Sequence, residues 1–249
     1  MSHRTFIALS ALILLVAAAL RLYDLPSYPP GPHYDEAVYL TMTRSIAFGG
    51  ARFFPIVEAY QGREVLWMYL NAPLLSLFGD RVLTLRYASA FANLITLAAC
   101  MGLARAMFPG KRGQLVALAA GAAFALSFPQ VWLARQAFRA VTLPLCQALA
   151  LWLLWRGLRA DKRAWLWLTL AGFVAGSAIY TYMASRLFPL WLFIAAAAFV
   201  VWSWRAAKAN RILQTPFQEP HSLIPSPSTG EGERAAETPP LHCMERGSF

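Results

Sequence analysis

The chain is organised around one polar stretch, Pro29-Pro30-Gly31-Pro32-His33-Tyr34-Asp35-Glu36-Ala37-Val38-Tyr39-Leu40. It follows an apolar run, Phe6 to Leu22, which can cross a hydrocarbon core of roughly 30 Å if Arg21 reaches back to the interface. A cleaved signal peptide ending at Ala17-Ala18-Ala19 is the competing interpretation of that run. Because further apolar runs follow, we expect the first one to be retained, so that two adjacent carboxylates open a short amphipathic helix at a membrane surface.

The composition indicates an integral membrane protein. Of 249 residues, 58% are hydrophobic and only 14% are charged. The formal net charge of +10 is compatible with nucleic-acid binding, but the Lys and Arg residues stand in short groups between apolar runs rather than along one basic face. We therefore expect a lipid bilayer as a partner and no nucleic acid. The three cysteines, Cys100, Cys146 and Cys243, are far apart, and the histidines lack metal-ligand spacing, so neither a disulfide framework nor a metal site is predicted.

Four or five further spans are expected after the first. The candidate runs are Tyr87 to Met107, Leu115 to Leu133, Val141 to Trp155, Ala164 to Met183, and Phe188 to Trp204. The predicted fold class is an all-α, polytopic transmembrane helix bundle of about six spans. Basic links at 109–113 and 156–163, and the exit at Arg205, all fall on the cytoplasmic side if the N-terminus does, which agrees with positive-inside bias. This topology places the long first loop, residues 24–85, on the outer side of the inner membrane.

The long outer first loop is expected to carry short interfacial helices. Asp35 can cap a helix that runs to about Phe48, where Gly49-Gly50 ends it. The segment Val65 to Phe78 is apolar but short for a span and contains Asn71 and Pro73. We therefore interpret it as a helix that lies in the interface or re-enters the membrane.

Two patterns in the second half of the chain complete the domain prediction. Gly172, Gly176 and Tyr180 recur every four residues and predict a face for close helix packing. After Ile212 the composition changes to Pro, Ser, Thr, Gly and Glu without hydrophobic periodicity, so we expect a membrane domain at 1–211 and a disordered tail at 212–249. The segment from His221 to Glu233 is similar to translated bacterial intergenic repeats, which indicates read-through after a frameshift.

Asp35 and Glu36 are the candidate catalytic residues. At the outer surface a carboxylate can take the proton of an acceptor hydroxyl as it attacks a sugar carbon, which is general-base catalysis. The free N–H groups of a helix N-terminus stabilise the anionic form that a base needs. The alternative is structural: Asp35 as a plain N-cap and Glu36 as a first-turn acid.

Arginines on the same predicted face favour a phosphate-bearing substrate. Guanidinium groups bind phosphate through two parallel hydrogen bonds, so arginines gathered at a membrane boundary suit a lipid phosphate. The alternative is nonspecific contact between snorkelling arginines and lipid headgroups. The candidate donor phosphate-binding residues are Arg63, Arg86, Arg135, Arg139 and Arg186.

The order of several short motifs is similar to the N-terminal half of GT-C membrane glycosyltransferases. The Asp-Glu pair after the first span is followed by Gly62-Arg63-Glu64-Val65-Leu66-Trp67-Met68-Tyr69-Leu70, Leu77-Phe78-Gly79 and Leu85-Arg86-Tyr87-Ala88-Ser89-Ala90. Arg135, and Tyr180-Thr181-Tyr182 followed by Arg186 and Pro189, also fit the pattern. The chain most resembles bacterial family 39-like enzymes, which are related to protein O-mannosyltransferases and lipid A aminoarabinose transferases.

The resemblance implies an inverting transfer of a sugar from a polyprenyl-phosphate carrier to an acceptor, which the sequence does not identify. It makes Asp35 the catalytic base, lets Glu36 assist or bind a metal, and leaves a divalent cation open as a cofactor. Arg63 and Arg135 would hold the donor phosphate. Val65 stands where these proteins usually have proline, and the family normally has about twice as many spans, so we interpret the chain as a truncated copy.

Two other function classes remain. A transporter or flippase of an anionic lipid predicts ionisable residues within spans, where the sequence offers little beyond Asn93 and Gln147. An inactive membrane fragment is the other alternative, and the composition of the tail favours it.

Overall fold

The structure, a computed structural model, describes residues 1–52, 56–57, 63–160 and 162–213. The chain divides into two units, Met1–Val200 and Val201–Phe249. The first unit holds the helix bundle, and the described part of the second is the end of helix α10 (Leu187–Leu213). The predicted tail lies outside the described residues from residue 214 on.

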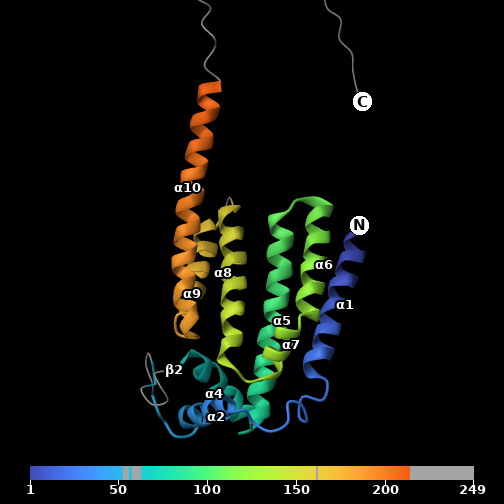
Figure 1. Ribbon diagram of the computed structural model, residues 1–249, viewed down its shortest axis with the longest axis vertical. Coiled ribbons are helices and arrows are strands. Elements are labelled where there is room, and N and C mark those ends of the chain that lie inside the picture. The colour runs from blue at the N-terminus through green and yellow to red at the C-terminus, as the bar shows by residue number, and fades with distance from the viewer. Residues whose placement is uncertain (53–55, 58–62, 161, 214–249) are drawn as a thin grey trace, which may run out of the picture. The chain divides into compact units, whose positions relative to one another are not determined.

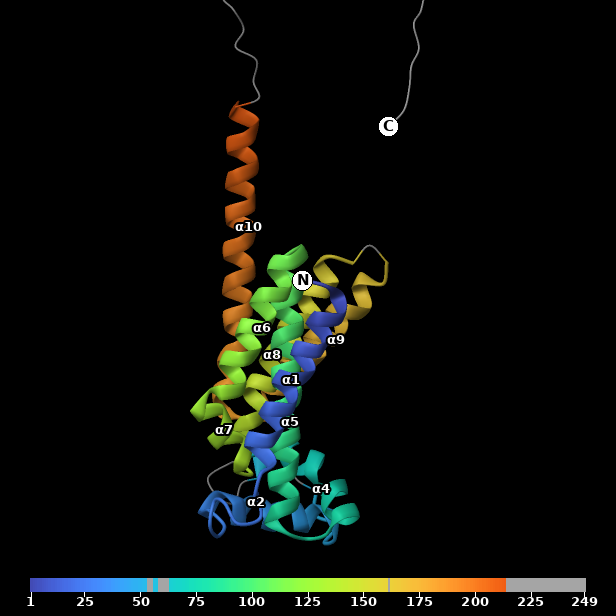
Figure 2. The same cartoon turned by 90° about the vertical axis from the view of Figure 1, so that its right-hand side faces the viewer.

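The first unit is an all-α bundle, as predicted (Figure 1). Helix α5 packs against α6 on one side and α8 on the other, α1 packs on α5 and α6, and α9 packs on α8 (Figures 1 and 2). The elements of the bundle are α1 (His3–Leu22), α5 (Val82–Met107), α6 (Gly110–Leu126), α7 (Phe128–Arg135), the 3₁₀ turn η1 (Arg139–Val141), α8 (Thr142–Leu158), α9 (Ala164–Ala178), the 3₁₀ turn η2 (Met183–Arg186), and α10.

Among the residues that the structure describes, four segments are long and apolar enough to cross a membrane, and α6 with α7 makes a fifth if the bent pair is one span. The sequence predicted about six, because it counted the run from Ala164 to Met183. In the structure, α9 ends at Ala178 after 15 residues, which is short for a hydrocarbon core. The four segments are His3–Leu22, Val82–Met107, Arg139–Leu158 and Met183–Arg205.

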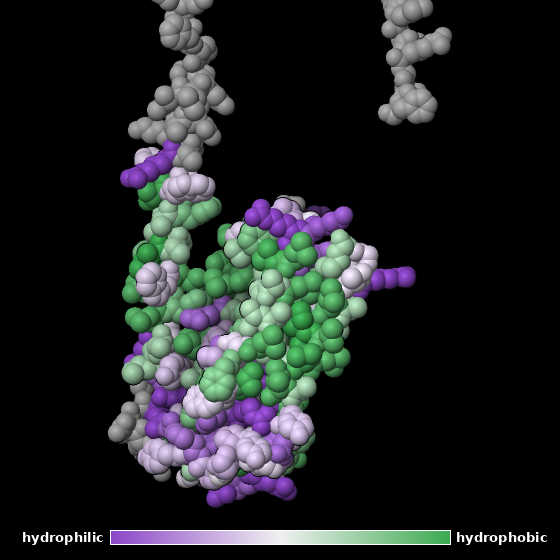
Figure 3. All heavy atoms as spheres, turned by 45° about the vertical axis from the view of Figure 1, so that its right-hand side comes forward, coloured by the Kyte–Doolittle hydropathy of each residue, from purple (hydrophilic) through white to green (hydrophobic). Residues whose placement is uncertain are grey.

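The surface of the bundle has the polarity of a membrane protein. In Figure 3, a band of hydrophobic side chains covers the helices and hydrophilic side chains gather at both ends. Such a band buries apolar side chains in lipid and leaves the charged ends in water. The multi-pass membrane prediction is therefore confirmed.

Arg21 turns into the bundle rather than toward the interface, which corrects the sequence prediction. Its side chain is 0% exposed. Its Nε donates to Asn93 Oδ1 at 2.8 Å, and its terminal nitrogens donate to the backbone oxygens of Ala17, Ala125 and Phe124. A buried cation is tolerated here because carbonyl oxygens at the end of α6 take its hydrogen bonds.

Those carbonyls lie where α6 and α7 bend by 58°, a break that the predicted straight span from Leu115 to Leu133 did not contain. Pro129, in the first turn of α7, has no backbone N–H to continue the hydrogen bonds of α6. Arg21 donates to the carbonyl of Ala125, which the break leaves open, and to that of Phe124, which also accepts the N–H of Ser127.

One end of the bundle, here called the loop end, carries α2 (Tyr34–Ala47) and α4 (Leu66–Phe78) (Figures 1 and 2). Between them, β1 (Ile56–Val57) pairs antiparallel with β2 (Arg63–Glu64). The N–H of Leu66 donates to the carbonyl of Tyr180, which ties the start of α4 to the turn after α9. The two predicted loop helices are thus confirmed within one or two residues at each end.

The packing face of α9 differs from the predicted one. No described atom comes within 4 Å of a Cβ built on Gly172 or Gly176. The buried residues of α9 are Ala171, Ala175 and Ala178, one helical position away, and α9 packs on α8. Small residues do make the packing face, but they are alanines rather than glycines.

Candidate active site

Glu36 lies at the centre of a closed hydrogen-bond network. Its side chain is 0% exposed and accepts four hydrogen bonds: two from Arg86 at 2.7 and 2.9 Å, one from the N–H of Ala137 at 2.9 Å and one from the N–H of His33 at 2.9 Å. A carboxylate offers about four acceptor positions. Its oxygens therefore have no acceptor position left for a substrate proton or a metal ion.

His33, not Asp35, caps α2. The His33 ring accepts from the Asp35 N–H, and the Glu36 carboxylate returns to the His33 N–H, which together form a capping box. The sequence prediction that Asp35 is the N-cap is therefore wrong by two residues, and its carboxylate is not used in capping.

Arg86 is also fully used inside the protein. Besides Glu36, it donates to the carbonyls of Pro29 at 2.9 Å and Gly31 at 2.6 Å. Gly31 has a φ of 68°, a conformation that other residues rarely adopt, and this turn presents its carbonyl to Arg86. Arg86 is 4% exposed, so this geometry suits fixing the Pro-rich turn to α5 rather than binding a substrate phosphate.

Arg135, like Arg86, donates to backbone carbonyls of the protein. It donates to five carbonyls at and after the end of α1, those of Leu20, Arg21, Tyr23, Asp24 and Tyr28, at 2.8 to 3.4 Å. These contacts fix the connection between the first helix and the polar stretch. Its place in the fold likewise suits a structural role.

Asp35 differs from its neighbour in being accessible. Its carboxylate is 30% exposed and forms an ion pair with Arg63 at 2.8 Å. Arg63 also donates to the hydroxyl of Tyr39 at 2.9 Å and lies over the Tyr39 ring. Since Tyr39 is one helical turn after Asp35, both lie on one face of α2.

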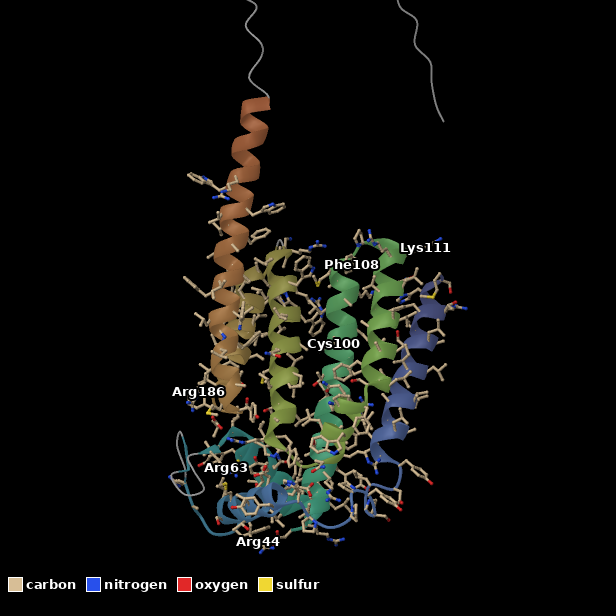
Figure 4. The ribbon with its side chains drawn as sticks, viewed as in Figure 1. Arg44, Arg63, Cys100, Phe108, Lys111 and Arg186 are labelled. Carbon is tan, nitrogen blue, oxygen red and sulfur yellow. The ribbon has the colours of Figure 1, made fainter. Side chains whose placement is uncertain are left out.

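A second pair of arginines joins this group through Glu64. Glu64 is 2% exposed and forms ion pairs with Arg139 and Arg186. Arg139 also donates to the Tyr39 hydroxyl at 3.2 Å and lies over the Tyr182 ring. Figure 4 shows Arg63 and Arg186 at the loop end, while Lys111 lies at the opposite end.

We call this group the arginine cluster: Arg63, Arg139, Arg186, Asp35, Glu64 and Tyr39. Three guanidinium groups and two carboxylates leave it one positive charge in excess. It brings together four of the seven predicted site residues, whereas Glu36, Arg86 and Arg135 have their polar atoms satisfied elsewhere. The sequence interpretation missed Glu64 and Tyr39. The four-residue spacing of Asp35 and Tyr39 on one helix would have indicated Tyr39.

Burial and hydrogen bonding act on three pKa values at the loop end. Burial alone raises the pKa of Glu36, but the hydrogen bonds from Arg86, Ala137 and His33 outweigh it and lower the pKa below its usual value. Burial raises the pKa of Tyr39, so its hydroxyl stays protonated. Burial lowers the pKa of Arg63, but Tyr39 and Asp35 outweigh that effect and raise it, so this guanidinium keeps its charge.

The residues present do not fit a divalent cation held by the protein alone. Across the described part of the chain, no three His, Cys, Asp or Glu side chains come together as a metal-binding group. The three carboxylates at the site are each paired with arginine.

The family model described as dolichyl-phosphate-mannose-protein mannosyltransferase matches residues 65–216, more than half of the chain. The chain belongs to this family. Membership makes it a membrane glycosyltransferase of the GT-C type. No curated protein and no solved structure matches the chain.

The part that matches the mannosyltransferase family includes some site residues and not others. Arg86, Arg135, Arg139 and Arg186 lie within residues 65–216. Asp35, Glu36, Arg63 and Glu64 precede the matched region, so their assignment depends on geometry.

Proposed function

We propose that the protein transfers a sugar from a polyprenyl-phosphate carrier to an acceptor hydroxyl at the outer face of the cytoplasmic membrane. The observation that supports this most directly is the accessible carboxylate of Asp35, 2.8 Å from Arg63, inside a cluster with excess positive charge. The cluster lies at one end of an apolar bundle, where a lipid phosphate and a water-borne acceptor can meet (Figures 3 and 4).

In this proposal, Asp35 is the general base. Its carboxylate takes the proton of the acceptor hydroxyl while that oxygen attacks the anomeric carbon of the sugar. The bond from that carbon to the carrier phosphate breaks, and the phosphate keeps the electron pair. Attack from the face opposite the phosphate inverts the anomeric configuration.

The arginines hold the phosphate and stabilise the charge that develops on it. Arg63, Arg139 and Arg186 come from β2, the segment before α8 and η2, so they surround the site from three parts of the chain. A phosphate can take over hydrogen bonds that Glu64 and Asp35 now accept, since it offers more acceptor oxygens and charge. Displacing Asp35 from Arg63 would free its carboxylate to act as a base.

Glu36, Arg86 and Arg135 act as positioning residues in this proposal. Glu36 joins the start of α2 to Ala137, two residues before Arg139, through its hydrogen bonds. It thereby fixes Asp35 relative to Arg139. Arg86 holds the Pro-rich turn, and Arg135 holds the end of α1.

The test is transfer of labelled sugar from a polyprenyl-phosphate donor in membranes that contain the full chain. Asp35→Asn keeps the shape of the side chain but removes the base, so transfer should fall about 10²-fold or more. Asp24→Asn, an exposed carboxylate outside the cluster, is the matched control and should keep its rate. Full activity of Asp35→Asn, at equal protein level, would overturn the assignment.

The buried Arg21 does not support the alternative function, transport of an anionic lipid. Such a function calls for an ionisable group facing a pathway. The donors of Arg21 are taken by Asn93 and backbone carbonyls at the α6 break. Its geometry is that of a structural residue.

A further inference from the structure

A groove separate from the arginine cluster lies between α4, α5 and the start of α8. Its volume is about 710 Å³, within the range of small-molecule sites. Its lining includes Trp67, Asn71, Arg81, Tyr87, Phe91 and Ile95.

One wall of the groove is an apolar stripe on α5. Tyr87, Phe91 and Ile95 recur every four residues and are 38%, 55% and 52% exposed, so the groove opens on the surface of the bundle. From Leu83 to Ile95 the stripe extends about 18 Å along the helix axis, at 1.5 Å per residue. Because α5 is a membrane-spanning helix, the chains of lipids surround this surface.

Arg81 places a positive charge at the loop end of the groove. It precedes the first residue of α5, and its guanidinium has no hydrogen-bond or ion-pair partner among the described residues. The neighbouring carboxylate, Asp80, is already paired with Arg44 at 2.6 Å. The groove is therefore apolar along α5 and cationic at the end where lipid headgroups lie.

Two buried polar residues also line the groove. Trp67 and Asn71 are 3% and 1% exposed, and within the described chain Trp67 Nε1 and Asn71 Oδ1 have no hydrogen-bond partner. The Asn71 amide nitrogen donates to the Trp67 carbonyl at 2.7 Å, which leaves its oxygen as the open atom. Leaving such groups unpaired costs about 1 to 3 kcal/mol each, so a polar group of a ligand at this level would be stabilised.

We propose that the groove binds one acyl chain of an anionic glycerophospholipid. The chain lies along Tyr87, Phe91 and Ile95, and the phosphate contacts Arg81. The glycerol and ester region lies at the level of Trp67 and Asn71.

The position of Arg81 favours an ordinary phospholipid over the sugar carrier. Asp80 contacts Arg44, which is nine residues after Asp35 on α2, or about 14 Å along the helix axis. Arg81 is therefore associated with the C-terminal end of α2, whereas the sugar of a carrier must come within hydrogen-bond reach of Asp35 at the N-terminal end. The groove is thus a second lipid site, independent of the proposed sugar transfer.

The experiment uses the full chain in lipid nanodiscs with a photoreactive phosphatidylglycerol whose acyl chain carries a diazirine. Cross-linked peptides are mapped by mass spectrometry. We expect labelling of the segment from Tyr87 to Ile95 to exceed labelling of the exposed residues of α1, and a phosphatidylcholine probe to label it several-fold less. Equal labelling of α1 and the groove would identify an annular lipid only and overturn the proposal.

Variants separate the apolar and the cationic contacts. Ala92→Trp fills the groove and should abolish its labelling, whereas Ala98→Trp, at an exposed position of the same helix outside the groove, should leave it unchanged. Arg81→Ala should reduce labelling by phosphatidylglycerol several-fold, and the exposed Arg52→Ala should not. Unlabelled polyprenyl phosphate should not compete; if it removes the label at stoichiometric amounts, the occupant is the carrier and the assignment is wrong.

Discussion

Asp35 and Glu36 are adjacent in sequence and have opposite environments. Successive residues of a helix point about 100° apart. The carboxylate of Glu36 therefore contacts Arg86 and Ala137, while that of Asp35 contacts Arg63. Glu36 is fully buried and Asp35 is 30% exposed. Asp35 is therefore accessible to a substrate, whereas the carboxylate of Glu36 is enclosed by hydrogen-bond donors of the protein.

The sequence indicates where the acidic pair and the arginines lie along the chain, but not which of their contacts are internal to the fold. An acidic pair after a Pro-rich turn indicates a helix start, and it gives no sign that Ala137, a hundred residues later, donates to one of the two acids. The same holds for Arg86 and Arg135. Their charge predicted phosphate binding, while the backbone carbonyls that occupy them come from distant turns that only the fold brings together.

Replacing Glu36 with Gln should destabilise the fold in a pH-dependent way. The substitution leaves Arg86 buried without its counter-charge, which costs about 3 to 5 kcal/mol. Because the folded pKa of Glu36 is lowered, its contribution is fully present above its usual value of 4.5 and is lost as pH falls through the folded pKa. Thermal unfolding in detergent should therefore show a large gap between the two proteins at neutral pH that narrows in acid.

Asp24→Asn serves as the comparison, because it removes an exposed carboxylate without a buried partner and should leave the melting curve in place at both pH values. A gap of the same size at neutral and acid pH would contradict the account of Glu36.

At the scale of elements, the break between α6 and α7 is the main departure from the predicted fold. The run from Leu115 to Leu133 is mostly apolar, so hydropathy alone predicts one span. Pro129 was the available signal for a break. The cation that stabilises it, Arg21, belongs to another helix and could not be recognised as the partner. Local patterns gave the ends of α2 and α4 to within one or two residues, because glycines that end helices are local signals, whereas the break depends on a tertiary contact.

Substituting Arg21 with Leu should destabilise both the break between α6 and α7 and the candidate site. It removes the donors to Asn93 and Ala125 and leaves these two oxygens unsatisfied, at about 1 to 3 kcal/mol each, while the Phe124 carbonyl keeps the N–H of Ser127. Displacement of α7 would also shift Arg135 and Ala137, the residues that hold the polar stretch and Glu36. We expect a lower melting temperature in detergent and a loss of sugar transfer.

Arg21→Lys, which keeps the charge but offers fewer directed donors, should recover part of the stability. Arg52→Leu, at an exposed loop position, should change neither quantity. An Arg21→Leu protein as stable as the parent would show that the break does not need this cation.

At the scale of the whole bundle, the two ends differ in how their basic residues are paired. Lys111 lies at one end, and Arg63 and Arg186 lie at the other (Figure 4). At the Lys111 end, Arg112, Arg156 and Arg159 lie over the rings of Phe108, Trp152 and Trp155, and no acid pairs with them among the described residues. At the loop end the arginines are largely balanced by Asp35, Glu36 and Glu64. Lys and Arg in short loops mark the cytoplasmic side, so the short basic links 109–113 and 156–163 predict that the arginine cluster faces outward.

Cysteine labelling tests that orientation directly. Tyr34 is 68% exposed beside Asp35, and Lys111 is exposed at the opposite end. A membrane-impermeant maleimide should label Tyr34→Cys in intact cells and Lys111→Cys only after permeabilisation, with the parent chain giving the background from its three native cysteines. The reverse pattern would place Asp35 in the cytosol, away from an acceptor on the outer face. The proposed direction of sugar transfer would then be wrong, while the loss of activity in Asp35→Asn would still report on the base. Orientation and chemistry are therefore tested by separate measurements.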